Sequence, residues 1–233
     1  MADECIICKD KLEYLEKNEI MECSICHKKE NSKTRCINKH YVCNECHTYG
    51  LDLIIDICLN ETSKNPIEII EKMMNLPFCH MHSPEHHVMV GSALLTAFHN
   101  AGGMLDLKAD LVEMINRGKQ IPGGTCGFWG AYGAGISSGT FISIISKSTP
   151  LTREPFGLAN LMTSNALAKI GKIGGPRCCK RNLYLSIIAA IDFVDKNFEI
   201  SMDNQQIICN RSNRNNQCLG IRCPFSKFYQ HEN

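Results

Sequence analysis

The amino-acid sequence predicts a mainly α fold, a helical bundle preceded by a small cysteine-rich module. Seven of the fifteen cysteines lie in residues 1–46, which are polar and show little helical periodicity. Apolar residues at helical spacing follow from about residue 65, and prolines and glycines mark where several of these patterns start and stop. We therefore divide the chain into a metal-binding module, residues 1–50, and a helical domain with an irregular cysteine-containing tail, residues 51–233.

The composition is that of an ordinary globular protein. The 233 residues are 44% hydrophobic and 21% charged, with a net charge of +1, so the basic excess typical of nucleic-acid or anionic-membrane binding is missing. No apolar run reaches the roughly 18 residues of a membrane helix, and the N-terminus does not read as a secretory signal. We therefore expect a cytoplasmic chain without nucleic-acid or membrane partners, whose fifteen cysteines serve metal or redox chemistry rather than disulfides.

Four pairs of metal ligands follow one another in the first 46 residues. They read Cys5-x2-Cys8, Cys23-x2-Cys26, Cys36-x3-His40 and Cys43-x2-Cys46. Eight ligands are enough for two tetrahedral zinc ions, and the short spacing lets both members of a pair reach one ion. So short a module has too little core to fold alone, and zinc would stabilise it. The alternative is a single zinc with some free thiols, with His27 and His47 as spare ligands.

The order of these pairs resembles the cross-brace of RING-like or treble-type zinc modules. In RING-type fingers alternate pairs share one ion. The resemblance implies that Cys5, Cys8, Cys36 and His40 hold one zinc and that Cys23, Cys26, Cys43 and Cys46 hold the other. The last cysteine pair of the RING order is absent and an extra pair comes first, so ligase activity is not implied. A protein partner of the module is the corresponding expectation.

Helical patterns follow one another through the second part of the chain. Asn65-Pro66 opens one, and Ser83-Pro84-Glu85 opens a second that stops at Gly102-Gly103. We predict further helices from Leu105 to Ile115, over residues 154–171 and over residues 179–198. Residues 121–139 are rich in glycine, residues 199–209 alternate loosely as in a strand, and the tail from Asn210 has the composition of a loop.

The later cysteines are predicted to lie at helix starts. Thr125 can cap a helix that begins near Cys126, and the Cys178-Cys179 pair opens another helix among three cations. A helix dipole lowers the pKa of a thiol at such a position. Cys218 and Cys223-Pro224 come from the tail, and a Cys-Pro pair is common around iron–sulfur ligands. We predict that Cys126, Cys178, Cys179, Cys218 and Cys223 meet and bind a cofactor such as an iron–sulfur cluster; alternatively they are small buried side chains, as we expect for Cys58.

Four histidines lie within residues 80–87. His82-x2-Glu85-His86 matches an inverted zincin pattern, but Pro84 places His82 outside the helix, so we do not expect a protease. His82 remains a candidate metal ligand, and His86 and His87 are candidate ligands or proton donors. The alternative is that these are half-exposed histidines around a helix start.

The stretch from His86 to Ser138 is similar to the C-GCAxxG-C-C family of redox-active helical proteins. The shared features are a helix rich in alanine and leucine (residues 93–98), Gly-Gly-Thr-Cys-Gly at 123–127 and later cysteines. The chain also resembles an uncharacterised family in which a cysteine finger precedes the motifs Cys-Gly-Phe-Trp-Gly and Arg-Cys-Cys, some of whose relatives are joined to methyltransferases. Here His86 or His87 stands near the early cysteine of the first family, and Tyr132 replaces a small residue or a cysteine.

These resemblances imply thiol or iron–sulfur chemistry, and three hypotheses of function remain. The first is a metal- and thiol-dependent redox or sulfur-transfer protein for a small, sulfur-containing substrate, with catalytic residues Cys126, Cys178, Cys179, His86 and His87. The second is a non-catalytic adaptor that binds a protein through its zinc module. The third is an accessory domain of methyltransferases, although no glycine-rich strand–turn–helix for S-adenosylmethionine is visible. The sequence leaves open whether the chain is an enzyme.

Overall fold

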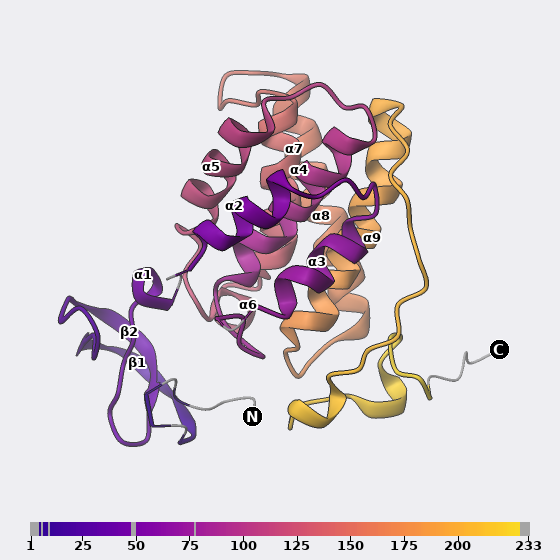
Figure 1. The fold of residues 1–233 in the computed structure, drawn as a ribbon. Helices are drawn as coiled ribbons and strands as arrows, with labels where there is room; N and C mark the ends of the chain where they lie inside the picture. The colour runs from indigo at the N-terminus through magenta and orange to yellow at the C-terminus, as the bar shows by residue number, and fades with distance from the viewer. Residues whose placement is uncertain (1–4, 6, 9, 48–49, 77, 229–233) are drawn as a thin grey trace.

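The computed structural model describes residues 5, 7–8, 10–47, 50–76 and 78–228. In this part of the chain a two-stranded sheet and a short helix precede a helical bundle, and the tail returns along one side of the bundle (Figure 1). The mainly α fold class with a leading cross-brace module is therefore confirmed. None of the described helices combines the length and the apolar character that a membrane crossing requires.

The cross-brace module, residues 5–46, is built on a hairpin. Strand β1 (Leu12–Glu22) pairs antiparallel with β2 (Lys29–Cys36), with an irregularity between Tyr14 and Glu19. Helix α1 (Asn44–His47) follows. The sequence did not predict these strands, because both faces of the hairpin carry charged residues and the apolar–polar alternation of a half-buried strand is missing. Arg35 links the strands instead, with Nε 2.6 Å from Glu13 and Nη1 2.5 Å from Glu19.

Helix α4 (His86–Asn100) forms the centre of the bundle. Its side chains from His86 to Phe98 are buried, because other helices surround it on every side. The helices in contact with it are α2 (Asp52–Leu59), α3 (Pro66–Met74), α5 (Leu107–Gly118), α7 (Gly133–Ile145) and α9 (Cys179–Phe198), while α8 (Glu154–Ile173) packs on α7 and α9. The first residues of α4 and α9 lie next to each other, and this end of the bundle carries the candidate site.

Two sequence-based expectations for local structure were wrong. Helix α6 (Thr125–Phe128) is a single turn that begins at Thr125, and its N-cap is Gly124 with φ 86°, a left-handed conformation that favours glycine. Thr125 therefore does not cap a helix starting at Cys126. Residues 201–209 are extended but form no strand, because they make only isolated backbone hydrogen bonds, such as Asp203 N to Lys64 O at 3.0 Å. Two 3-10 turns (Ser212–Arg214 and Gly220–Arg222) follow in the tail.

Candidate functional site

Two groups of four ligands lie in the cross-brace module. One group is Cys5, Cys8, Cys36 and His40, the other is Cys23, Cys26, Cys43 and Cys46, and within each group the ligand atoms all lie within 4.8 Å of one another. Alternate ligand pairs thus share a site, as the cross-brace resemblance implies. The thiols are in contact, since the Cys8 and Cys36 sulfurs are 3.4 Å apart and those of Cys26 and Cys43 are 3.5 Å apart.

The hairpin explains how these ligands meet. Cys23 follows β1 directly and Cys36 ends β2, so pairing of the strands fixes both relative to the turns that carry the other ligands. Three thiols with an imidazole, or four thiols, are the donor sets of tetrahedral structural metal sites. His27 is not needed, because its ring contacts Glu22 at 3.1 Å and is 75% exposed. The side chain of His47 lies outside the described part of the structure.

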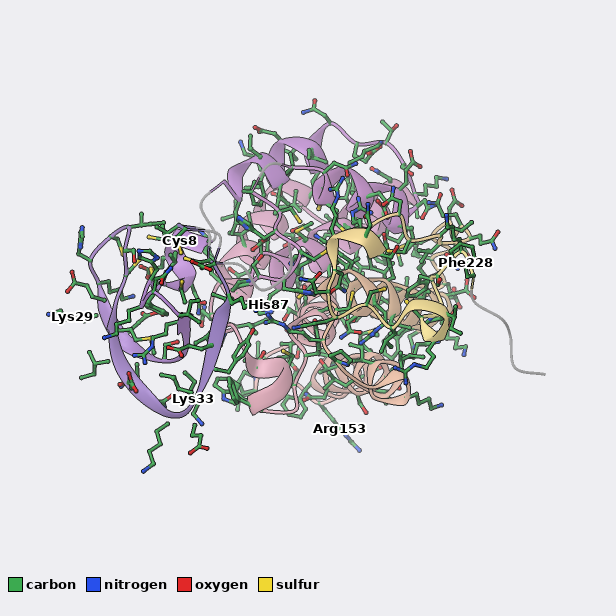
Figure 2. The ribbon with its side chains drawn as sticks, turned by 90° about the horizontal axis from the view of Figure 1, so that it is seen from below. Cys8, Lys29, Lys33, His87, Arg153 and Phe228 are labelled. Carbon is green, nitrogen blue, oxygen red and sulfur yellow. The ribbon has the colours of Figure 1, made fainter. Side chains whose placement is uncertain are left out.

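A cleft of about 970 Å³ separates the cross-brace module from the helical bundle. The two parts meet at its edge, where the rings of Tyr14 and Phe128 lie 6.4 Å apart. Lys33 stands over the Phe128 ring at 5.1 Å and Arg177 over the Tyr14 ring at 5.3 Å. In Figure 2 His87 lies near the boundary between the two parts. The cleft thus takes one wall from each part of the chain.

Three cysteines of the helical domain line this cleft: Cys79, Cys126 and Cys179. Cys126 is partly exposed, whereas Cys179 is 8% exposed and its sulfur accepts a hydrogen bond from Tyr132 Oη at 3.3 Å. Burial raises the pKa of Tyr132 well above its ordinary value, so the phenol remains a donor at neutral pH. Tyr132 is therefore the hydrogen-bond partner of a cleft thiol.

The expected activation of Cys178 and Cys179 by the helix dipole was wrong in sign. Both residues lie at the start of α9, where Cys178 accepts a hydrogen bond from Arg181 N at 3.4 Å and caps the helix. Burial nevertheless raises the pKa of Cys178 to about 11 and raises that of Cys179. Loss of hydration disfavours the thiolates more than their hydrogen bonds and the nearby cations favour them.

The two candidate histidines of α4 have different surroundings. His87 lines the cleft, donates from Nδ1 to Ile121 O at 3.0 Å, and packs its Nε2 edge against Gly133. His86 does not line the cleft. It is 1% exposed, and its Nδ1 donates a hydrogen bond to Ser83 O at 2.8 Å. Burial, followed by the charge of Lys180, lowers the pKa of His86 well below its ordinary value. His87 therefore remains a candidate for proton transfer, whereas His86 has a structural position.

Lys180 connects α9 to the segment before α4. It is 2% exposed, and its ammonium group lies 2.8 Å from His86 Nε2, 2.9 Å from His80 O and 3.0 Å from Cys79 Sγ. A carboxylate lies in the same polar network, since Glu85 is fully buried and accepts a hydrogen bond from His80 N at 2.8 Å. Burial alone would raise the pKa of Glu85, but the hydrogen bond with His80 and the nearby His86 lower it to about 2.

His82 belongs to neither four-ligand group and bridges two segments instead. Its Nδ1 accepts from the backbone N–H of Cys179 at 3.4 Å, and its Nε2 donates to Asn215 Oδ1 at 3.2 Å. The ring thus joins the start of α9 to the tail. Both nitrogens are engaged in hydrogen bonds, so the ring is not arranged as a metal ligand.

A second, smaller cavity lies on the other side of the start of α9. Four cysteines line it: Cys178, Cys209, Cys218 and Cys223. The five predicted cofactor-binding cysteines are therefore divided, with Cys126 and Cys179 in the cleft and the other three in this cavity. Sequence reasoning missed Cys209 and Cys79. For Cys209 the available signal was the close succession of three cysteines from Cys209 to Cys223; for Cys79 it was the adjacent histidines.

The cleft carries an excess of positive charge. Among its lining residues are six lysines and arginines but one carboxylate, Glu30. The cations are Lys33, Arg35, Arg177, Lys180, Arg211 and Arg214. Arg35 pairs with the hairpin glutamates and Arg211 pairs with Glu71 at 2.7 Å, and other cations of the lining also have partners, so the excess of positive charge belongs to the lining as a whole. A small anion is therefore the ligand that this lining would attract.

Comparison with known proteins places the chain in a family but supplies no function. A family model described as a family of unknown function matches residues 54–226. No curated protein and no solved structure matches the chain. The matched region begins after the cross-brace module. It includes the cysteines of the helical domain that line the cleft and those that line the smaller cavity. It fits the resemblance to an uncharacterised family, whereas the resemblance to the C-GCAxxG-C-C family stays a prediction.

Proposed function

The chain belongs to the DUF5714 family of unknown function, and from the chemistry of its cleft we propose a thiol-dependent redox or sulfur-transfer protein that acts on a small anionic molecule. The observation that supports this most is that a partly exposed thiol, Cys126, and a nearly buried one, Cys179, line the same cationic cleft. An accessible attacking thiol with a shielded second thiol suits exchange at sulfur. We place this chemistry in a reducing compartment, the cytoplasm, since all fifteen cysteines are free.

The proposed reaction is exchange with a small anionic disulfide or persulfide. The Cys126 thiolate forms a bond to one substrate sulfur, the substrate S–S bond breaks, and the other sulfur leaves as a thiolate. With a persulfide the outer sulfur is transferred to Cys126. With a disulfide, Cys179 then attacks the Cys126 sulfur, passes its proton to the departing thiolate, and leaves a Cys126–Cys179 disulfide. His87 is the candidate acceptor for the Cys126 proton, because it lines the same cleft.

The test compares two disulfide reagents of different charge. We expect Cys126 to be the first cysteine that reacts. The rate with an aromatic disulfide that carries two carboxylates, divided by the rate with an uncharged pyridyl disulfide, should be higher for Cys126 than for free cysteine. Replacing a cleft cation, Arg177→Gln, should lower this ratio by about two- to fivefold and make it less salt-dependent. Peptide mass spectrometry identifies the modified cysteine.

The matched control is Arg153→Gln. Arg153 lies on the surface at the start of α8 and does not line the cleft (Figure 2). This variant should keep the ratio of the parent protein. The proposal is contradicted if Cys126 reacts no faster than free cysteine and shows no preference for the anionic reagent.

For the cross-brace module we propose two zinc ions with a structural role. Their support is the pair of four-ligand groups, whose thiol and imidazole donors suit zinc. Purified protein should contain about two zinc ions per chain, and Cys23→Ser should remove about one of them, because three ligands hold zinc more weakly than four. Retention of both ions in Cys23→Ser would exclude the assigned ligand set.

A second function, a protein-binding adaptor, is favoured by one feature of the module. Four of its described isoleucines are exposed: Ile7 at 43%, Ile20 at 75%, Ile25 at 50% and Ile37 at 49%. Exposed apolar side chains on a small module suit a protein partner. Inert Cys126 and Cys179 in the reagent test would favour this function over the first.

A further inference from the structure

The small cavity beside α9 collects cysteines from three separate places in the chain. Cys178 caps the start of α9, Cys209 ends the extended segment, and Cys218 and Cys223 flank the second 3-10 turn of the tail. Arg211 holds the tail in place, since it is 6% exposed and pairs with Glu71 on α3 at 2.7 Å. Four thiols from a stretch of the chain that runs from Cys178 to Cys223 thus share one cavity.

The backbone around the tail thiols repeats the pattern of the cross-brace ligands. In the module, the amides of Ile7, Ile25 and Asn38 each donate to the cysteine sulfur two residues earlier, at 3.3–3.5 Å. In the tail, Arg211 N and Gly220 N donate to the sulfurs of Cys209 and Cys218 at 3.4 Å. Amides directed at sulfur favour thiolates and orient them as metal ligands.

A core cysteine shows the contrast. Cys58 is fully buried in α2, and its sulfur donates to Ser92 O at 3.8 Å instead of accepting from an amide two residues later. A thiol that serves only as a small apolar side chain thus has a different hydrogen-bond pattern. The tail cysteines resemble the cross-brace ligands, not Cys58.

Arg181 is a buried cation that lines the same cavity as the four thiols. This residue is 2% exposed, and its guanidinium bonds neutral oxygens: Gly174 O at 2.8 Å, Pro176 O at 2.9 Å and the Asn182 side chain at 3.1 Å. Within the described chain no carboxylate pairs with it, yet it lines the cysteine cavity. Since a buried charge requires a counter-charge, thiolates in an anionic centre would balance this cation.

The dimensions favour a group of several atoms over a single ion. Tetrahedral zinc brings its thiolates to about 3.8 Å from one another, as its Zn–S bonds of about 2.3 Å require. Among the described residues, groups of ligands within 4.8 Å occur in the cross-brace module, and the four cysteines of this cavity do not form one. They surround a cavity of about 40 Å³ instead. On the same scale one water molecule needs roughly 10–15 Å³, so the cavity has room for a group of several atoms.

We infer that Cys178, Cys209, Cys218 and Cys223 bind an iron–sulfur cluster in this cavity. Four cysteine thiolates are the usual ligands of such clusters, and Cys223 is followed by proline as in many of them. The four thiols release their protons to solvent when the cluster binds. The site does not depend on the function proposed for the cleft, but Cys178 and Cys179 are neighbours in the chain, so the cluster would lie beside a cleft thiol.

The test is anaerobic reconstitution of the full-length protein with ferrous and ferric iron and sulfide. We expect equal amounts of iron and acid-labile sulfide, in addition to the zinc of the module, and a broad visible absorption. Cys209→Ser and Cys223→Ser should each lower the bound iron at least about fourfold, since a four-thiolate site loses a ligand. Cys126→Ser and Cys58→Ala, outside the cavity, should retain it.

A second measurement uses the parent protein, so its result does not depend on whether the cysteine variants fold. Alkylation of the reconstituted protein, read by peptide mass spectrometry, should spare Cys178, Cys209, Cys218 and Cys223, and all four should react once the iron has been removed with chelator. The inference is overturned by a colourless protein that takes up no iron. It is also overturned by a third zinc ion in the tail, or by iron that is lost in Cys126→Ser and kept in Cys209→Ser.

Discussion

Lys180 shows how a single buried charge can organise the candidate site. Its ammonium group has three acceptors: Cys79 Sγ and His80 O in the segment before α4, and Nε2 of His86, the first residue of α4. The fully buried Glu85 supplies a negative charge in the same network. Removing the cation would take its hydrogen bond from each of these acceptors, and the segment that carries His82 would lose this attachment to α9.

We therefore expect Lys180→Met to lower the free energy of unfolding by about 1–3 kcal/mol, the usual cost of removing one partner from buried hydrogen bonds. Denaturant unfolding followed by circular dichroism measures it. The control is Lys169→Met, because Lys169 forms an exposed pair with Asp192 at 3.4 Å and should change the free energy by no more than about 0.5 kcal/mol. Equal effects of the two substitutions would show that the network does not stabilise the fold.

The buried histidines predict a pH dependence of stability. His86 and His87 have pKa values lowered, first of all, by burial, so the folded chain keeps them neutral. The unfolded chain takes up their protons below about pH 6.5, and because it then binds more protons, the free energy of unfolding falls as the pH drops below that value. Glu85, with its pKa of about 2, adds a further loss only below about pH 4.3.

Replacing one of these histidines should reduce the slope. Between pH 6.5 and 5, His86→Gln should remove up to about 1.4 kcal/mol per pH unit from the dependence of the unfolding free energy on pH, since one titrating group is lost. Chemical denaturation at several pH values gives this slope. His99→Gln, at the exposed end of α4, is the comparison, and an identical slope in His86→Gln and the parent would contradict the assignment.

At the scale of elements, α7 approaches α4 through a glycine beneath His87. A Cβ atom at Gly133 would lie 2.1 Å from Cδ2 and 2.3 Å from Nε2 of that ring. Gly133→Ala should therefore displace His87 from its place in the cleft and destabilise the protein by about 1–3 kcal/mol through overpacking. Thermal unfolding and the reactivity of Cys126 are the two measurements.

A second glycine gives the matched comparison. Gly171 lies within α8, and a Cβ atom there would meet no atom within 4 Å. Gly171→Ala should stabilise the protein by about 0.5–1 kcal/mol, because alanine loses less conformational freedom in a helix. If both substitutions changed the free energy of unfolding in the same direction, the close contact between α7 and His87 would not explain the glycine at position 133.

The elements also show what the sequence could predict. The predictions for α3, α5, α8 and α9 lie close to the observed bounds, because proline, asparagine, aspartate and glycine mark their ends and apolar spacing marks their buried faces. The hairpin was missed because its strands are held by Arg35 and by the ligand geometry, not by a buried face. The tail has no periodic signal, since Arg211, Asn215 and the cysteines fix it through long-range contacts that local spacing cannot indicate.

For the candidate site, ligand spacing carried more information than helix position. The four short pairs indicated two metal sites, the resemblance to a cross-brace implied the alternate pairing, and the two ligand groups have that pairing. The pKa of Cys179 could not be predicted, because it depends on burial, which only the packed structure determines. Likewise Cys178 and Cys179 are adjacent in sequence but line different cavities, which follows from the opposite directions of neighbouring side chains at the start of α9.

At the scale of the whole molecule, the cleft exists because two parts of the chain face each other. The family match covers the helical part from residue 54, whereas Tyr14, Lys33 and His40 contribute the other wall. Trp129, the single tryptophan, lines the cleft and is 66% exposed. Its fluorescence therefore reports on the arrangement of the two walls.

Removal of the module's metal should separate the two parts without unfolding the bundle. We expect the fold of the module to depend on the metal ions proposed for it, because it has little apolar core, whereas the bundle has a continuous core around α4. Chelation should shift the Trp129 emission and remove the preference of Cys126 for anionic reagents, while the helical circular dichroism signal changes by less than about a tenth. Tyr14→Ala, which removes the contact with Phe128 but no metal ligand, should give a smaller shift at full metal content. A helical signal that falls in step with metal release would instead mean that the two parts fold as one unit, and that the metal sites support the bundle as well as the wall of the cleft.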